Sequence, residues 1–294
     1  MKEKSNIIVF IRYQKIVAFS LTILLWGAVS QAAELIAAHN LQVELVPTEM
    51  KLIGRDDITI ETDGTGILAF RVSESLTQIQ VIVDNDQRDF EFNDGRLLLN
   101  LKPHEQSAEL HIRIHYTGIF DDPVPLRPVN TDNPGFGVTG TISPNGCFLL
   151  AGAGWYPELI NSRATYRVTV KAPDGMIAVT AGRSRGHISE NGKTVSSWQV
   201  DYPTRGLALS VARYVVAEES VGKVTAATYL LPPNQHLAAE YLRATAGYIA
   251  LYSDLFGPYP FQKFAVVENF FPTGFGFPSY TLMGGTVLRL PFIV

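Results

Sequence analysis

Several side chains have the residue types for catalysis, but their spacing fits none of the corresponding mechanisms. Ser184 lies in Gly-Arg-Ser-Arg-Gly at 182–186, which matches the nucleophile elbow of serine hydrolases. Such an elbow turns directly into a helix, whereas the residues after Gly186 lead through Asn191 and Gly192 into another expected strand. The sequence therefore predicts a hairpin loop around Ser184.

The histidines do not form a metal-binding motif. His111 and His115 lie on one face of an expected strand with Arg113 between them, so a metal would need a third ligand from elsewhere beside a cation. We expect a solvated strand face there. His104 and Glu105 begin like H-E-x-x-H, but Ala108 occupies the position of the second histidine. We assign no catalytic residue and no metal ligand.

Two further signals are weak. The residues 135–140 fit G-x-G-x-x-G, but a proline-rich loop precedes them and Pro144 follows, so the strand and helix of a phosphate site are missing. Cys147 is the single cysteine and has no partner for an internal disulfide. We predict a small buried residue at that position.

The best candidate for binding is the aromatic, glycine-rich stretch from Phe256 to Met283. Glycines within it leave bare backbone between aromatic rings, which suits the floor of a groove for an extended chain; the alternative is an aromatic core around a tight turn. Glu268 is the nearest acid, and strand alternation leaves its direction open. The candidate substrate-binding residues are Gly274, Phe275, Gly276, Phe277 and Glu268.

The composition and the amino end predict an exported globular protein. The chain has 294 residues, 46% of them hydrophobic, and a net charge of −4 at pH 7. Basic residues precede the uncharged apolar run 16–29, and Ser30, Gln31 and Ala32 follow, as in a secretory signal peptide over residues 1–32; an uncleaved membrane anchor is the alternative. Cleavage would make the charge more negative, which disfavours nucleic acid as a partner. We expect a periplasmic or extracellular location without stable membrane insertion.

The hydrophobic pattern predicts a mainly β protein. Apolar residues alternate from Leu41 to about Leu231, and Asn-Gly or Asp-Gly turns separate the runs, which predicts a large β-domain over residues 33–231. After Pro232 the spacing becomes helical, with Asn234 as the expected cap and Gly257 as the end, and a strand follows at 263–269. Residues 232–294 would thus begin a second, incomplete domain. The apolar run 286–294 either docks as a strand or marks a shortened chain.

Several segments in this order resemble the aminopeptidase N family of zinc metallopeptidases, the gluzincins. Residues 40–117 resemble its first β-sheet, which ends in HYTG at 115–118. WYP at 155–157, followed by ATYRVTVKAP at 164–173, resembles a later segment of the same domain. LFGPYPFQKF at 255–264 is similar to the entry of the catalytic domain and is the most specific match. The resemblance covers nearly all of the chain after residue 32.

The resemblance implies a large saddle-like antiparallel β-sandwich followed by the first helix and strands of a thermolysin-like α+β domain. In the family, H-E-x-x-H and a later glutamate bind zinc and activate water against the peptide carbonyl. The sequence ends shortly before that helix is expected, so it implies the amino-terminal and substrate-groove portion of a zinc metallopeptidase, inactive as this chain. Zinc and the missing catalytic segment are then expected only in the complete protein. A non-catalytic β-rich scaffold that binds peptides or proteins is the alternative.

The resemblance also locates a departure in substrate recognition. Residues 274–280 occupy the place of the family's G-A-M-E-N strand, and Gly276 or Phe277 stands at its amine-binding glutamate. A second amine-facing acid or amide is replaced within residues 146–149. Because no carboxylate remains to neutralise a buried ammonium, specificity for a free amino end is not expected.

Overall fold

The computed structural model describes residues 35–127 and 137–288. The expected signal peptide, the first residues of the G-x-G-x-x-G match and residues 289–294 of the run 286–294 lie outside these ranges. Within them, no helix is long and apolar enough to cross a membrane. The part from Leu35 onward forms one compact unit.

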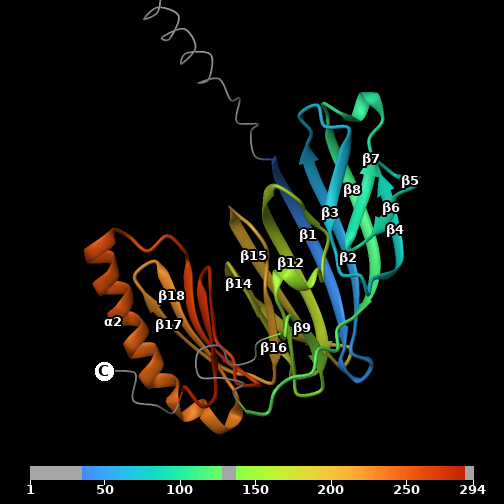
Figure 1. Ribbon diagram of the computed structural model, residues 1–294. Coiled ribbons are helices and arrows are strands. Elements are labelled where there is room, and N and C mark those ends of the chain that lie inside the picture. Colours follow the sequence, from blue (N-terminus) through green and yellow to red (C-terminus); the bar gives the residue numbers. More distant parts are fainter. Residues whose placement is uncertain (1–34, 128–136, 289–294) are drawn as a thin grey trace, which may run out of the picture. The chain divides into compact units, whose positions relative to one another are not determined.

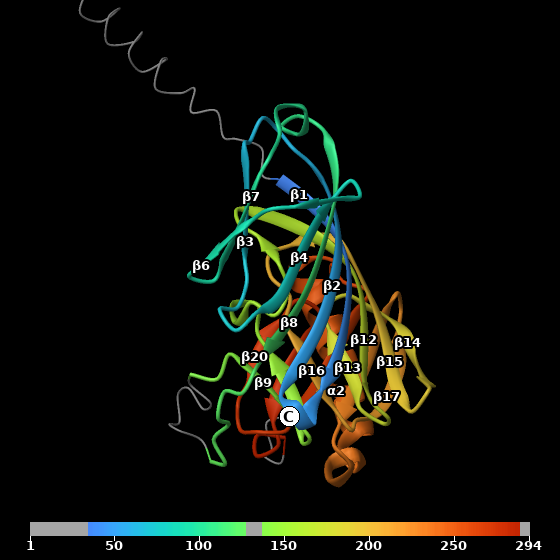
Figure 2. The same ribbon diagram turned by 90° about the vertical axis from the view of Figure 1, so that its right-hand side faces the viewer.

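The largest sheet has eight strands, in the order β14-β15-β12-β1-β2-β8-β4-β5. β1 lies in its interior, antiparallel to β2 and parallel to β12, and Figure 2 shows the long strands side by side. The bounds are β1 Leu35–Val46, β2 Lys51–Glu61, β4 Thr77–Val83, β5 Asp86–Arg88, β8 Glu109–Ile119, β12 Ser162–Pro173, β14 Arg183–Glu190 and β15 Lys193–Thr204.

Two four-stranded sheets share a core with the large sheet. Their orders are β11-β3-β7-β6 and β13-β16-β10-β9. Figure 1 labels β3, β6 and β7 of the first sheet and β9 and β16 of the second. The bounds are β3 Ile67–Arg71, β6 Glu91–Asn93, β7 Arg96–Asn100, β9 Gly140–Ser143, β10 Gly146–Leu149, β11 Glu158–Leu159, β13 Ile177–Thr180 and β16 Leu209–Ala212. One continuous apolar cluster includes Val43 and Val168 of the large sheet, Phe70 of β3 and Val211 of β16. The predicted period of two arises because alternate side chains of long strands such as β1, β2, β8 and β12 enter this core.

A five-stranded sheet, in the order β17-β18-β19-β21-β20, contains the later strands. The bounds are β17 Val215–Val221, β18 Val224–Leu230, β19 Lys263–Asn269, β20 Phe275–Phe277 and β21 Tyr280–Gly284. β17 and β18 precede the predicted domain boundary at residue 232, yet β18 pairs with β19 in this sheet. The boundary itself stays a prediction.

The single α-helix of the described residues, α2 (Ala238–Phe256), begins later than Asn234. Asn234 lies inside the 3₁₀ turn η4 (Pro232–Leu237), and the N-cap of α2, Leu237, makes no side-chain capping bond. The prediction that Asn234 caps the helix was therefore wrong, because its amide instead binds the carboxylate of Glu268. The remaining 3₁₀ turns are η1 Pro47–Glu49, η2 Pro103–Glu105 and η3 Ala151–Ala153.

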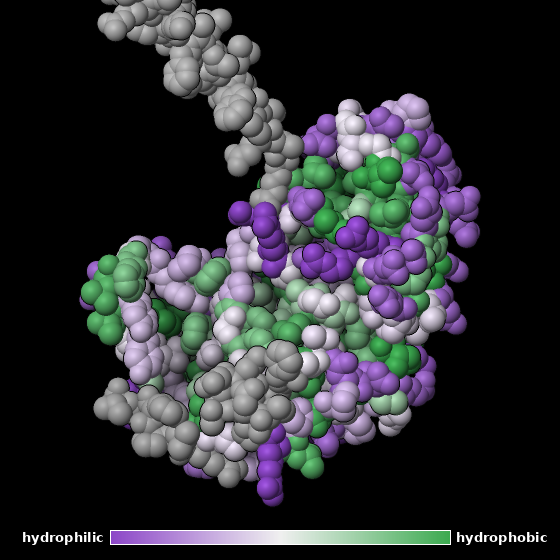
Figure 3. All heavy atoms as spheres, viewed as in Figure 1, coloured by the Kyte–Doolittle hydropathy of each residue, from purple (hydrophilic) through white to green (hydrophobic). Residues whose placement is uncertain are grey.

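The predicted apolar side of α2 packs only in its first half. Tyr241 is buried and its hydroxyl donates to the Leu288 carbonyl at 3.3 Å. About two to four turns further along the helix, apolar side chains are exposed, and they gather at the far end of α2 at the upper left of Figure 3. We call this set the α2 stripe: Tyr248, Leu251, Tyr252, Leu255 and Phe256.

The hairpin loop predicted around Ser184 lies elsewhere: Ser184 is within strand β14, and the turn of the hairpin is at residues 191–192. β14 and β15 are antiparallel and joined at Asn191 and Gly192, both with positive φ. Ser184 lies in β14 next to an irregularity in the pairing, and its hydroxyl accepts the Gly186 N–H at 3.0 Å. A strand-to-strand connection cannot provide the helix that follows a nucleophile elbow.

Cys147 is buried in β10, as predicted. Desolvation raises the pKa of the thiol to about 12, so the nucleophilic thiolate is scarce at neutral pH. We expect Cys147 to resist a disulfide-exchange reagent such as 5,5′-dithiobis(2-nitrobenzoate) at pH 8 in the native protein and to react fully in denaturant. Rapid, complete labelling under native conditions would contradict this burial.

Candidate peptide-binding edge

The candidate residues Gly274 to Phe277 form an edge of the five-stranded sheet. β20 pairs on one side with β21, and the sheet ends there. The two-residue turn of Pro278 and Ser279 joins the strands, with φ of 71° at Ser279. Ser279 Oγ accepts the Gly182 N–H at 3.0 Å, which fastens this turn to the residue before β14. The edge is thus held by its neighbours rather than hanging as a free loop.

The aromatic side chains of β20 face the β-sandwich core. Phe275 lies 5.7 Å from Phe148 of β10, and Phe277 lies 4.7 Å from Tyr280, measured between ring centroids. Both phenylalanines are only partly buried. The structure therefore brings Phe275 of the candidate stretch 274–277 together with Phe148 of the segment 146–149.

Gly276 presents bare backbone at the same edge. It is exposed, and a Cβ added there would meet no atom within 4 Å. Phe277 and Tyr280 close the two-residue hairpin, so in an antiparallel ladder the N–H and C=O of Gly276 point away from β21. Unpaired backbone groups of this kind are where an extended peptide can add a strand.

Glu268 occupies a different position from the other candidates. It lies on β19, with β21 between it and β20, and is 3% exposed. Its carboxylate accepts the Leu231 N–H at 2.8 Å and the Asn234 Nδ2 donor at 2.6 Å. These bonds fix the start of η4 against β19, which is a structural role. Ligand contact by Glu268 remains a prediction that this geometry does not favour.

Lys263 is a buried residue that the sequence reasoning did not single out. Its Nζ donates to the Thr180 carbonyl at 2.8 Å and lies 4.3 Å from the Trp198 ring centroid and 5.2 Å from that of Tyr280. Burial lowers the pKa of Lys263 to about 7, although the charge of Glu218 acts in the opposite direction. The sequence does contain one hint of this burial, because Lys263 is the first residue of the largely apolar strand β19.

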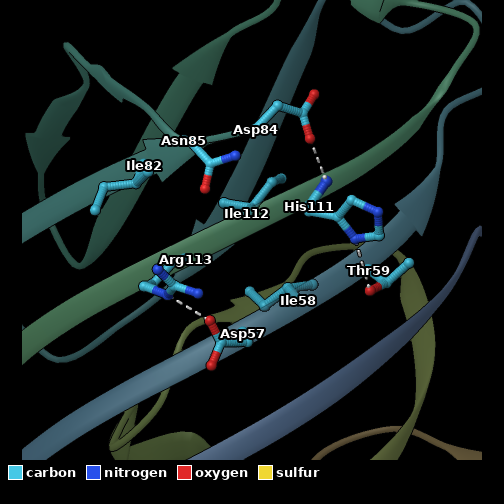
Figure 4. A pocket seen from close by; sticks show the side chains of 9 residues that line it. All are labelled: Asp57, Ile58, Thr59, Ile82, Asp84, Asn85, His111, Ile112 and Arg113. Atoms are coloured by element: carbon cyan, nitrogen blue, oxygen red, sulfur yellow. Dashed lines mark hydrogen bonds and ion pairs between the residues drawn. The ribbon is translucent and has the colours of Figure 1, made fainter.

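The histidines of β8 lie on the outer face of the large sheet. His111 lines a pocket of about 290 Å³ together with Arg113, Asp57 and Thr59 (Figure 4). His111 Nδ1 lies 3.2 Å from Thr59 Oγ1, and Arg113 Nε donates to Asp57 at 2.5 Å. Desolvation and nearby arginines lower the pKa of His115. His111 is exposed, which confirms the expected solvated strand face at that residue.

Across residues 35–127 and 137–288, no three or more histidine, cysteine or acidic side chains are grouped so that they could hold a metal ion.

Comparison with known proteins places the fold. Neither a family model nor a curated protein matches the sequence. The M1 zinc metallopeptidase of Deinococcus radiodurans is similar in structure, with a TM-score of 0.66 at 17% identity over 85% of this chain. A mutant of that enzyme bound to a Tyr-Ser-Ala substrate gives 0.63 at 18% identity. A two-domain M1 mutant bound to L-tryptophan gives 0.65 at 17% identity.

The matches define the class of fold. The chain has the β-rich fold of M1 zinc metallopeptidases, the aminopeptidase N family, as the sequence resemblance implied. It spans 60% of the length of the M1 chain from Deinococcus radiodurans. The predicted fold class, a large β-sandwich followed by a helix and strands, is confirmed.

Proposed function

We propose that this chain is the amino-terminal and substrate-groove portion of a zinc metallopeptidase of the aminopeptidase N type. The complete protein would hydrolyse peptides with zinc-activated water, and this chain would bind the peptide without cleaving it. The observation that carries the proposal is the edge strand β20, whose Gly276 backbone is exposed beside a wall of aromatic rings. Extended peptides bind such edges through main-chain hydrogen bonds and side-chain pockets.

The catalytic residues of the complete protein would come from a segment carrying H-E-x-x-H, which the printed sequence does not contain. We propose that this segment covers the α2 stripe. Tyr252 is 54% exposed and Phe256 81% exposed, an unusual position for large apolar side chains spaced along one side of a helix. A purified chain should accordingly contain no stoichiometric zinc, and bound zinc measured by atomic absorption would contradict the assignment.

We further propose that the amino end of the ligand need not be free. The resemblance puts Gly276 or Phe277 in place of the amine-binding glutamate and replaces a second amine-facing group within residues 146–149, and none of these residues can compensate a buried ammonium. Acetylated and free peptides should therefore bind the edge with similar affinity.

Two variants of Gly276 test the binding edge. Proline at this position removes the outward N–H without breaking a ladder bond to β21, whereas alanine keeps the N–H and its Cβ meets no atom. We expect Gly276→Pro to weaken binding by about tenfold, the value of one or two main-chain bonds, and Gly276→Ala to bind like wild type.

The assay is fluorescence anisotropy with a labelled hexapeptide of alternating alanine and phenylalanine, in acetylated and free forms. Circular dichroism shows whether both variants remain folded. Equal affinity of the proline and alanine variants would reject β20 as the binding edge.

A non-catalytic scaffold is the second candidate, because the strands β19 and β21 already share the large apolar core through Ala265, Val267 and Leu282. Both proposals expect peptide binding at β20. They are separated by adding the H-E-x-x-H segment of a complete M1 protein, expressed as its own polypeptide. Recovery of zinc-dependent cleavage supports the peptidase portion, and a chain that stays monodisperse without associating supports the scaffold.

A further inference from the structure

A second pocket is lined by Gly182, whose N–H also bonds Ser279 in the turn between β20 and β21. It has a volume of about 210 Å³ and lies between β14, β15 and the turn of Pro260 to Gln262 that precedes β19. Arg183 lines it, together with the rings of Tyr202 and Phe261, whose centroids are 4.8 Å apart. One wall is thus cationic and another is aromatic.

A second guanidinium group, that of the exposed Arg185, bonds the same pocket-lining residue as Arg183, namely Gln199. Arg185 Nε donates to Gln199 Oε1 at 2.8 Å, and Arg183 Nη2 reaches the same oxygen at 3.3 Å. Asp201 Oδ2 lies 3.6 Å from Arg183 Nη2, beyond hydrogen-bond distance, and the Gln199 amide donates to the other oxygen of Asp201. Among these contacts, the two guanidinium groups of Arg183 and Arg185 face one carboxylate, that of Asp201, so the local charge is positive.

The donors of Arg183 are not fully used by the described residues. Its Nε is buried and has no hydrogen-bond partner among them. Buried donors are normally paired, and an unpaired one needs an explanation such as a bound ion or ligand. A guanidinium presents planar, paired donors that match the oxygens of a carboxylate or phosphate. The local excess of positive charge contrasts with the net charge of −4 of the chain.

We propose that this pocket binds an oxyanion, a carboxylate or a phosphate, between Arg183 and Arg185, with any apolar part of the ligand against Tyr202 and Phe261. The ligand would complete the hydrogen bonding of Arg183 and would join β15 to the turn that leads into β19. This site takes no residue from β20, so the proposal stands apart from the peptide-binding function.

The test measures the melting temperature of the purified chain, and its binding affinity by isothermal titration calorimetry. The ligands are sodium phosphate, sodium acetate and sodium phenylacetate, and sodium chloride at equal ionic strength is the control. We expect saturable stabilisation by at least one of the oxyanions. Phosphate alone would assign a phosphate ligand, and a stronger response to phenylacetate than to acetate would assign an organic carboxylate held by the aromatic wall.

Variants distinguish binding of the oxyanion at this pocket from a general effect of salt on the charges of the protein. Arg183→Gln should weaken binding by about tenfold, because one charge-assisted contact is lost, and Asp201→Asn should strengthen it by removing a competing carboxylate. Arg243→Gln, on the exposed side of α2, is the matched control and should bind like wild type. If Arg183→Gln does not fold, Arg185→Gln serves instead. Absence of saturable binding, or weaker binding by Asp201→Asn, would overturn the proposal.

Discussion

Replacing Lys263 by methionine is expected to remove a pH dependence of stability between about pH 7 and pH 10. The amine is enclosed by Trp198 and Tyr280 and donates to Thr180, and its pKa is lowered from 10.5 to about 7. Between these two values the unfolded chain binds more protons than the folded chain, so stability rises with pH in that window. At 1.36 kcal/mol per unit, the wild-type free energy of unfolding should gain roughly 3–4 kcal/mol relative to Lys263→Met from pH 7 to pH 10.

The measurement is urea unfolding followed by circular dichroism at four pH values across the window. Lys223→Met, at an exposed lysine, controls for the loss of one positive charge and should run parallel to wild type. Parallel curves for Lys263→Met and wild type would show that the amine is not held uncharged in the folded protein. At pH 7 the methionine variant should be nearly as stable as wild type or more so, because it carries no ammonium to desolvate.

Glu268→Ala is expected to destabilise the fold by about 3 kcal/mol. The change leaves the partly buried Leu231 N–H and the buried Asn234 amide without this acceptor, and each unpaired buried donor costs about 1–3 kcal/mol. Glu268→Gln should cost less, since one side-chain oxygen can still accept. Chemical denaturation of both variants measures the loss.

A double-mutant cycle with Asn234→Ala isolates the contact between the two side chains. Asn234→Ala removes the amide donor, so the double variant should cost less than the two single changes added together. Strictly additive losses would show that the contact contributes little. Peptide binding by Glu268→Gln should equal that of wild type. A loss of binding without a loss of stability would instead indicate that Glu268 contacts the peptide.

The sequence predicted most strands because their alternation is local. The pairing of β14 with β15 was indicated by the Asn191–Gly192 turn, which also excluded an elbow at Ser184. The position of residues 274–277 at a strand edge was likewise expected from glycines beside aromatic rings, and β20 is an edge strand. In these segments neighbouring residues determine the backbone conformation.

Contacts between distant segments could not be read in the same way. The burial of Glu268 depends on Leu231 and Asn234 returning to the end of β19, and no local pattern specifies that return. Asn234 was predicted to cap the helix because it precedes the helical pattern. Its actual partner, Glu268, lies 34 residues further along the chain and could not be predicted from the local sequence. The Lys263 amine lies over the ring of Trp198, which belongs to β15 of another sheet, so no pattern near residue 263 could predict its burial.

The location of β1 has a consequence for biogenesis. This strand is among the first of the described residues to emerge during synthesis, yet its parallel neighbour β12 ends only at Pro173. Until that segment is made, one side of β1 remains an open hydrogen-bonding edge, which in a nascent chain is prone to pair with other molecules. Closing such a long-range parallel pair is slow, so we expect the polypeptide to depend on a holding chaperone until the ribosome has passed β12.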